Sequence, residues 1–359
     1  MQIILAFVTS LLTMACAEKP AAAPPPPPPP AAQGTGGILT GAGATFPYPV
    51  YSKWFDAYNK KTGVAINYQS IGSGGGIRQF TQGTVDFGAT DSPMSDEQIA
   101  AVQGNVVHLP TVLGAVVLTY NLPALGTQRL KLDAATVADI FLGKITRWDH
   151  PRLAALNPGV KLPKTDLLVV HRSDGSGTTF VFVDYLSKVS PEWKTKVGAS
   201  TSVAWPIGLG GKGNEGVTQQ VKQLEGTIGY VELVYASSNK LPVALLSNSA
   251  GQFVEPTLEA VTSAAAGAKL EKGTDFRVSL TNAPGAKAYP ITSYTWLLVK
   301  ADTPDAARAK ALRNFLDWMI TPEAQQMAST LGYAPLPAEV AGLIKDRIKT
   351  LKSGGKPIA

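Results

Sequence analysis

Apolar residues between Ile38 and the C-terminus follow two patterns, one that repeats every three to four positions and one that forms short unbroken runs. The first pattern predicts helices that bury one face, and the second predicts strands. Val50, Trp54 and Tyr58 are four positions apart, for example, so residues 47–61 are predicted to be a helix. Further helices are predicted at 77–82, 135–142, 178–189, 217–224, 306–320, 323–331 and 337–351, and strands at 64–68, 85–89, 106–120, 166–170, 228–231 and 289–299.

Strands and helices alternate along most of the chain, and this order predicts an α/β fold. Alternation of this kind favours mostly parallel sheets with helices on both faces. The length of 359 residues favours two domains. We expect a discontinuous first lobe, 38–118 and 290–359, into which a second lobe, 119–289, is inserted. A ligand is then expected in the crevice between the lobes, outside the carboxyl ends of the strands.

The first 37 residues have the composition of an export signal followed by a spacer. An apolar run at 3–12 is too short to span a membrane as a stable helix, and it leads into Thr13-Met14-Ala15-Cys16. This arrangement resembles a bacterial lipoprotein signal, in which residues 1–15 are removed and Cys16 is lipidated. An ordinary secretory signal is the alternative. Residues 16–37 contain seven consecutive prolines and are predicted to be an extended tether. The protein is therefore expected in the periplasm or cell envelope, with the lipid as its only membrane contact.

Composition and charge exclude several classes of function. The net charge is +6, and no basic block with interleaved aromatic residues is present, so nucleic-acid binding is not expected. The single cysteine cannot form an intramolecular disulfide. The three histidines are far apart in the sequence and lack metal-site spacing. We expect neither a metal nor another cofactor, and a monomer.

A catalytic function is not expected either. Ser176 lies in Asp-Gly-Ser-Gly, which lacks the leading glycine of a nucleophile elbow. Two alternatives outside the class of binding proteins for small ions stay open. A secreted phosphatase would need a nucleophile or metal cluster that the sequence does not offer, and a surface-anchored interaction protein would bind a protein partner through its tether.

Four loops that combine glycine with serine or threonine follow predicted strands or precede predicted helices: 40–47, 72–75, 89–92 and 172–178. Such a loop at a helix start presents unpaired backbone N–H groups and the positive end of the helix dipole, which together bind anions. Arg172 adds a planar charged group, and Ser176 and Thr178 add hydroxyls. One such loop is usually only a turn. Four at corresponding positions predict a site for a small oxyanion.

Asp91 is unusual in such a site, because a carboxylate repels an anion unless the ligand carries a proton. An ionised Asp91 would accept a hydrogen bond from protonated phosphate and reject sulfate, which has no proton near neutral pH. Arsenate carries the same proton and cannot be distinguished by this argument. The alternative interpretation of Asp91 is the N-cap of a helix at 93–100. Asp174 is expected to orient the Arg172 guanidinium, and its alternative role is in a turn.

Six motifs together resemble one family. They are TGAGATFP at 40–47, IGSGG at 71–75, VDFGATD at 85–91, RSDGSGT at 172–178, WPIGLGGKGN at 205–214 and IGYVE at 228–232. The chain from about Leu39 to Pro357 is similar to the periplasmic phosphate-binding proteins of Pst ABC transporters, which are type II periplasmic binding proteins. The resemblance implies a two-lobed Venus-flytrap fold that closes on one phosphate ion and delivers it to the transporter membrane subunits. It implies the ligand residues Thr45, Phe46, Ser73, Asp91, Arg172, Ser176, Gly177 and Thr178, with Asp174 in support.

Overall fold

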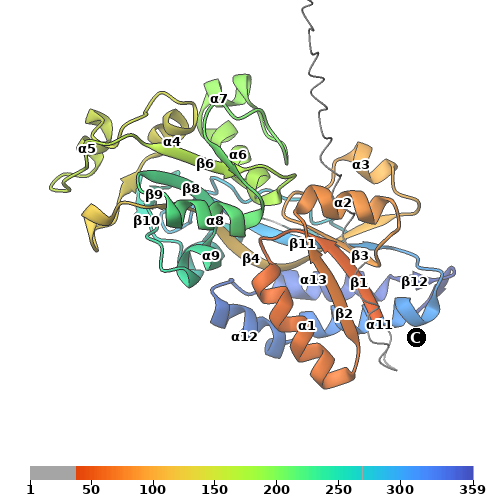
Figure 1. The fold of residues 1–359 in the computed structure, drawn as a ribbon. Helices are drawn as coiled ribbons and strands as arrows, with labels where there is room; N and C mark the ends of the chain where they lie inside the picture. The colour runs from red at the N-terminus through yellow and green to blue at the C-terminus, as the bar shows by residue number, and fades with distance from the viewer. Residues whose placement is uncertain (1–37, 269, 359) are drawn as a thin grey trace, which may run out of the picture. The chain divides into compact units, whose positions relative to one another are not determined.

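An eight-stranded mixed sheet forms the centre of the computed structural model, which describes residues 38–268 and 270–358 (Figure 1). The strand order is β2-β1-β3-β11-β4-β8-β6-β7. Its strands are β1 (Ile38–Gly43), β2 (Ala65–Ser70), β3 (Phe87–Thr90), β4 (Val106–Tyr120), β6 (Leu168–Arg172), β7 (Leu209–Gly211), β8 (Thr227–Glu232) and β11 (Thr292–Lys300). There are two smaller sheets. One has three strands, β5 (Lys131–Leu132), β9 (Leu245–Ser247) and β10 (Phe253–Val254), and the other has two, β12 (Lys352–Ser353) and β13 (Lys356–Pro357).

The long strand β4 joins two sets of parallel strands. Its residues up to Ala115 pair antiparallel with β11, and those from Val116 onward pair antiparallel with β8. The strands β1, β2 and β3 are parallel to one another on one side, as are β6, β7 and β8 on the other. Every residue of β4 after Val106 is buried, which explains why it appears in the sequence as an unbroken apolar run. The sheet is thus mostly parallel within each set, as expected, and antiparallel where β4 and β11 meet their neighbours.

Helices cover both sides of these strands. Their bounds are α1 (Tyr48–Thr62), α2 (Ser73–Thr81), α3 (Asp96–Ala100), α4 (Ala134–Phe141), α5 (Pro151–Leu156), α6 (Gly177–Val189), α7 (Pro191–Lys196), α8 (Gly213–Gln223), α9 (Leu233–Ser238), α10 (Leu258–Ala266), α11 (Ala306–Met319), α12 (Pro322–Leu331) and α13 (Ala338–Lys349), with a short 3-10 turn at Pro123–Leu125. No helix in the described ranges is both long and apolar enough to cross a membrane.

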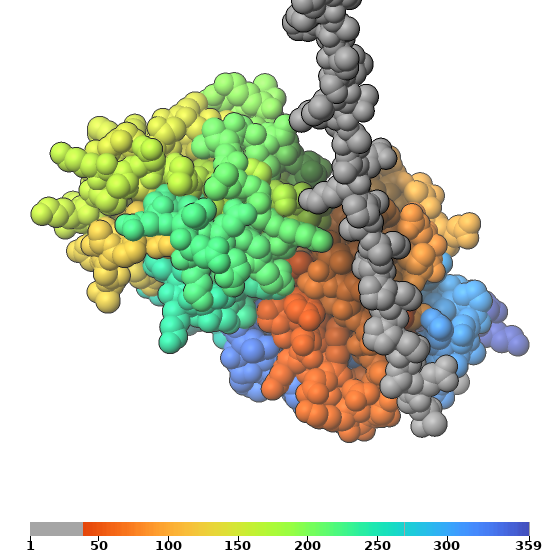
Figure 2. Space-filling model, in the orientation of Figure 1, coloured from red at the N-terminus to blue at the C-terminus, as the bar shows by residue number. Residues whose placement is uncertain are grey.

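The C-terminal helices return to the N-terminal strands. The indole N–H of Trp54 in α1 donates to the carbonyl of Ala324 in α12 at 2.8 Å. The same indole meets Trp318 of α11 edge to face, with ring centroids 6.5 Å apart. In the space-filling view the orange surface of the N-terminal segment adjoins the blue surface of the C-terminal one (Figure 2). Aromatic packing therefore joins parts of the chain that lie far apart in sequence.

Three helices begin at residues that differ from the starts expected from the apolar periodicity of the sequence. α2 begins at Ser73 rather than at residue 77, and α8 begins at Gly213 rather than at 217. Both first turns are rich in glycine and polar residues, so they carry no apolar period. The helix expected at 93–100 is only α3, and its N-cap is Ser95, whose hydroxyl accepts from the Gln98 N–H. The interpretation of Asp91 as a helix cap is therefore wrong.

Candidate functional site

The loop after β1 carries Thr45 and Phe46 into the start of α1. Two backbone hydrogen bonds fix the position of this loop, because the carbonyl of Gly43 accepts from the N–H groups of Ile71 and Gly72. The Tyr235 hydroxyl donates to the Thr45 carbonyl at 2.5 Å, and the Tyr333 hydroxyl donates to the Phe46 carbonyl at 2.7 Å. Thr45 and Phe46 are both buried. Their carbonyls are thus satisfied within the chain, whereas their amide groups have no acceptor among the described residues.

The first turn of α2 brings Ser73 against the end of β3. The Ser73 hydroxyl oxygen accepts from the Asp91 N–H at 3.1 Å, and Ser73 is completely buried. Its own amide is the first of the helix and has no intrahelical partner. The next amide, that of Gly74, donates to the Gly175 carbonyl at 2.9 Å. This bond places the α2 start directly beside the 172–178 loop.

Asp91 follows β3 directly and is 1% exposed. Its Oδ1 accepts from the Thr295 hydroxyl at 2.7 Å, and Ser73 Oγ lies 3.5 Å from its Oδ2. Burial raises the pKa of Asp91 to about 7, even though the Thr295 hydrogen bond and the positive charge of Arg172 both favour the ionised form. Asp91 therefore exchanges its proton near neutral pH, which suits a group that shares a proton with its ligand.

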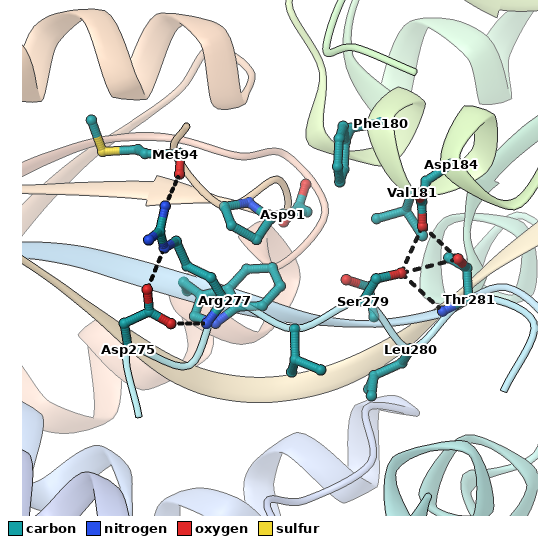
Figure 3. A pocket seen from close by; sticks show the side chains of 14 residues that line it. Asp91, Met94, Phe180, Val181, Asp184, Asp275, Arg277, Ser279, Leu280 and Thr281 are labelled. Carbon is teal, nitrogen blue, oxygen red and sulfur yellow. Dashed lines mark hydrogen bonds and ion pairs between the residues drawn. The ribbon is translucent and has the colours of Figure 1, made fainter. Parts of the chain in front are cut away.

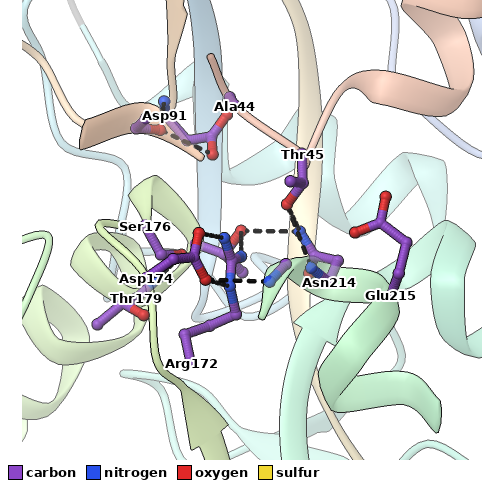
Figure 4. A network of polar contacts seen from close by, with 12 residues as sticks. Ala44, Thr45, Asp91, Arg172, Asp174, Ser176, Thr179, Asn214 and Glu215 are labelled. Carbon is purple, nitrogen blue, oxygen red and sulfur yellow. Dashed lines mark hydrogen bonds and ion pairs between the residues drawn. The ribbon is translucent and has the colours of Figure 1, made fainter. Parts of the chain in front are cut away.

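Arg172 ends β6 and its side chain is almost fully buried. Its Nε and Nη2 donate to the two carboxylate oxygens of Asp174 at 2.7 and 2.6 Å (Figure 4). Its Nη1 donates to Thr178 Oγ1 at 3.3 Å. Burial acts to raise the pKa of Asp174, but the hydrogen bonds and charge of Arg172 outweigh it and hold that pKa below the ordinary range. The guanidinium is thus fixed in orientation and paired with one negative charge.

The start of α6 supplies the remaining residues of the predicted set. Ser176 is the N-cap, and its hydroxyl oxygen accepts from the Thr179 N–H at 3.0 Å. Its own N–H donates to the Thr201 carbonyl at 2.8 Å, so that amide is already occupied. Gly177 and Thr178 are the first two residues of the helix, and their amides have no partner within it. These N–H groups lie at the positive end of a 13-residue helix.

Gly177 faces the end of β3 at close range. A Cβ at this position would lie 2.4 Å from Ser73 Oγ and 2.6 Å from Asp91 Oδ2. Only glycine allows this approach without displacing a neighbour. The structure therefore brings Ser73, Asp91, Gly177, Thr178 and Arg172 into one buried cluster, and Asn214 links Thr45 to it.

Several residues of the cluster were not predicted as site residues. They are Thr295, Tyr235, Tyr230 and Asn214. The Thr295 hydroxyl donates to Asp91, and the Tyr235 hydroxyl donates to the Thr45 carbonyl. The Tyr230 hydroxyl accepts from the Arg172 N–H at 3.0 Å, and Asn214 Nδ2 donates to both Thr45 and Thr178. Asn214 ends the WPIGLGGKGN motif, so the sequence does carry a signal for it. Tyr230 lies in the IGYVE motif and is indicated in the same way, whereas no local pattern indicates Thr295 or Tyr235. Cys16 lies outside the described residues.

A cavity of about 340 Å³ lies beside this cluster (Figure 3). Asp91 is the only predicted site residue among the 14 that line it. Arg277 and Asp184 border the cavity, and both are already bonded to neighbours: Arg277 to Asp275 and Asp96, and Asp184 to Ser279 and Thr281. The cavity therefore offers no free charged group for an anion, and the buried cluster is the better candidate site.

The histidines have structural roles. Burial lowers the pKa of His108 to about 4, and its Nε2 accepts from the Met94 N–H at 3.1 Å. His150 caps α5, and the ring of His171 stacks on Trp205. Within residues 38–268 and 270–358 no three His, Cys, Asp or Glu side chains are grouped as metal ligands.

Comparison with known proteins identifies the family. A model of the PBP superfamily domain matches residues 28–323. The phosphate-binding protein PstS of Haemophilus influenzae is 47% identical over 312 residues, which is 87% of this chain and 92% of that protein. The PstS protein of Methanocaldococcus jannaschii is 40% identical over 338 residues, with 88% and 86% covered.

Solved structures show the same fold. A phosphate-binding protein from Stenotrophomonas maltophilia superimposes with a TM-score of 0.69 at 18% identity, over 86% of this chain and 93% of that one. A high-affinity periplasmic phosphate-binding protein with bound phosphate gives a TM-score of 0.70 at 20% identity, with the same coverage. The chain belongs to the PBP superfamily and, within it, to the PstS family of phosphate-binding proteins.

Proposed function

We propose that this protein binds one inorganic phosphate ion in the buried cluster around Asp91 and delivers it to the membrane subunits of a Pst ABC transporter. The observation that carries this proposal is a buried carboxylate surrounded by hydrogen-bond donors that lack acceptors among the described residues. The predicted ligand residues are Thr45, Phe46, Ser73, Asp91, Arg172, Ser176, Gly177 and Thr178. Family membership supports the same function and argues against an enzyme.

The proposed ligand is held mainly by neutral donors. The amides of Thr45, Phe46, Ser73, Gly177 and Thr178 are available at the starts of α1, α2 and α6. The charge of Arg172 is balanced by Asp174 at 2.6 Å, so the guanidinium contributes direction as well as charge. Such a site binds an anion without a large excess of positive charge.

Asp91 selects the anion by accepting a hydrogen bond from an O–H of the ligand. HPO₄²⁻ and H₂PO₄⁻ each carry an O–H that can donate to the carboxylate, whereas sulfate would set two acceptors against each other in a buried place. Asp91 Oδ2 lies 2.6 Å from the point that a Cβ on Gly177 would occupy. This short distance supports direct contact between Asp91 and a ligand bound at the start of α6.

We further propose that the ligand bridges two lobes, 38–118 with 290–359 and 119–289. The change of partner along β4 between Ala115 and Val116 supports this division. Contacts such as Gly74 N–H to the Gly175 carbonyl cross from one lobe to the other. An anion held by donors from both sides would favour the closed state.

We place the protein in the periplasm or cell envelope, because a structural relative is described as periplasmic and the N-terminal sequence resembles an export signal. A lipid on Cys16 and the extended tether at 16–37 stay proposals from the sequence. The same applies to a monomeric state.

Isothermal titration calorimetry with phosphate, arsenate and sulfate tests the proposal on the wild type and on Asp91→Asn. We expect the wild type to bind phosphate and arsenate but not sulfate. Asp91→Asn should weaken phosphate binding by roughly 10- to 100-fold and allow sulfate to bind, because the amide can donate where the carboxylate only accepts. A wild type that ignores phosphate would refute the function. A variant that still excludes sulfate would refute the role of Asp91.

A further inference from the structure

We infer that Asn214 is a positioning residue that fixes the hydroxyls of Thr45 and Thr178 as donors to the bound anion. The inference rests on the proposed function and assigns a specificity role to a residue outside the predicted ligand set. Asn214 lies in the first turn of α8 and is completely buried. It has no direct part in the predicted shell, so it acts through the two threonines.

The side-chain amide of Asn214 has only one orientation that satisfies its neighbours. Its Oδ1 accepts from the Glu232 N–H at 2.9 Å, and an N–H can only donate. The Nδ2 group is therefore directed at two hydroxyl oxygens: Thr45 Oγ1 at 2.7 Å (Figure 4) and Thr178 Oγ1 at 3.1 Å. Both amide hydrogens are used.

The hydrogen-bond capacity of each threonine then determines the direction of its proton. A hydroxyl has one donor and two acceptor positions. Thr45 Oγ1 accepts from both the Nδ2 and the backbone N–H of Asn214, the latter at 3.2 Å. Thr178 Oγ1 accepts from Asn214 Nδ2 and from Arg172 Nη1. Neither hydroxyl donates to any described residue, so each O–H is left for the ligand.

The hydrogen bonds from Asn214 make the hydroxyls of Thr45 and Thr178 selective for ligand oxygens that accept. A free hydroxyl can rotate and accept from a ligand as easily as it donates. With both acceptor positions filled, Thr45 and Thr178 can only donate, and they need no reorganisation when the anion arrives. Asn214 thereby favours unprotonated oxygens at these two positions, while the Asp91 carboxylate provides an acceptor for the ligand proton.

A double-mutant cycle measured by phosphate titration tests the inference. We expect Asn214→Ala to weaken phosphate binding by about tenfold or more in the wild type. In a Thr45→Val/Thr178→Val background, the same substitution should change affinity by less than about threefold, because the hydroxyls through which it acts are gone. Asn214 also bonds Thr45, which belongs to the other proposed lobe, so its loss could act by weakening a contact between lobes. A second cycle, with Thr178→Val alone, tests the positioning role separately, because Thr178 and Asn214 belong to the same proposed lobe.

Two further variants make the test robust. Asn214→Asp retains the acceptor for the Glu232 N–H but turns the hydroxyl protons away from the ligand, so it should bind phosphate more weakly than Asn214→Ala. Asn157 is a matched control, because it is buried and makes the same kind of bonds away from the site, accepting from the Lys131 N–H and donating to the Lys131 and Leu153 carbonyls. Asn157→Ala should lower stability and leave phosphate affinity unchanged.

Additive effects of Asn214 and the two threonines would overturn the inference while leaving the proposed function intact. A wild type that does not bind phosphate would instead overturn the proposed function, and the inference with it.

Discussion

Burial and hydrogen bonding act in opposite directions on the pKa of the Asp91 carboxylate. Burial disfavours its charge, and Thr295, Arg172 and Ser73 favour it; the balance leaves the pKa near 7. Asp174 meets the same guanidinium with two short bonds, and its pKa is lowered instead. The two carboxylates therefore suit different roles in the proposed site: Asp174 is held ionised beside Arg172, and Asp91 has a pKa near neutral pH.

The raised pKa of Asp91 predicts how stability depends on pH without ligand. The folded state binds the proton more tightly than the unfolded state, whose pKa is about 3.8, so the contribution of Asp91 is fully present below about pH 4 and is lost as pH rises to about 7. The loss should be roughly 3 kcal/mol. Urea unfolding in phosphate-free buffer across this range measures it.

Asp91→Asn is the control for this pH dependence, since its amide does not titrate. The free energy of unfolding of the wild type minus that of the variant should fall as pH rises. A difference that stays level, or rises, would show that Asp91 is ionised in the free protein.

At the scale of elements, the start of α6 determines how closely the 172–178 loop approaches β3. Ser176 caps the helix, and the glycine that follows allows its first turn to lie against Ser73 and Asp91. The sequence motif at this place thus serves two purposes: it ends one strand with Arg172 and begins a helix without a side chain in the way.

Gly177→Ala should weaken phosphate binding by roughly 10- to 100-fold, because the added methyl overpacks the contact with Ser73 and Asp91. Phosphate titration of the purified variant measures the change. Gly342→Ala in α13 is the matched control, since a Cβ there meets nothing within 4 Å. It should retain affinity and gain up to about 1 kcal/mol of stability. Equal affinity in the two variants would contradict the close approach.

At the scale of the whole described chain, several polar contacts join the two segments that we propose as lobes. Arg277 donates to Asp96 Oδ1 at 2.7 Å and to the Met94 carbonyl at 3.1 Å, and Trp296 Nε1 donates to the Phe276 carbonyl at 3.0 Å. Met94, Arg277 and Trp296 line the cavity next to Asp91. Figure 3 shows the bond from Arg277 to the Met94 carbonyl. We expect these contacts to stabilise the closed state of the proposed lobes from outside the anion cluster.

Arg277→Ala should speed phosphate release by about two- to fivefold, a small factor because Asp96 is 84% exposed and the pair is partly screened. Stopped-flow measurement of the dissociation rate tests this, and added salt should reduce the difference. Arg308→Ala is the control, because Arg308 pairs with Asp86 inside one proposed lobe. If both variants release phosphate at the same increased rate, the contact across the lobes is not the cause.

Local sequence patterns predicted every described helix of ten or more residues and six of the eight strands of the central sheet, because apolar spacing reflects which face a segment buries. They missed β1 and β7 and several short helices, among them α7 and α9. The strand 106–120 and the helix 306–320 match β4 and α11 to within a residue. The patterns placed the starts of α2 and α8 four residues too late, because the first turns of both helices are built from glycine and polar residues without an apolar period. They also could not provide the antiparallel direction of β4 and β11, since a buried strand looks the same in either direction.

The sequence by itself determined the class of fold, the glycine loops and the family, because these depend on local composition and on motifs in order. Only the tertiary structure decided which residues meet in the cluster. Thr45 and Asn214 are 169 positions apart, and Asp91 and Thr295 are 204 apart, so their contacts depend on how the strands are arranged in the sheet. The pKa of Asp91 and the fixed direction of two hydroxyl protons are consequences of burial and of those distant partners, and a linear pattern contains neither.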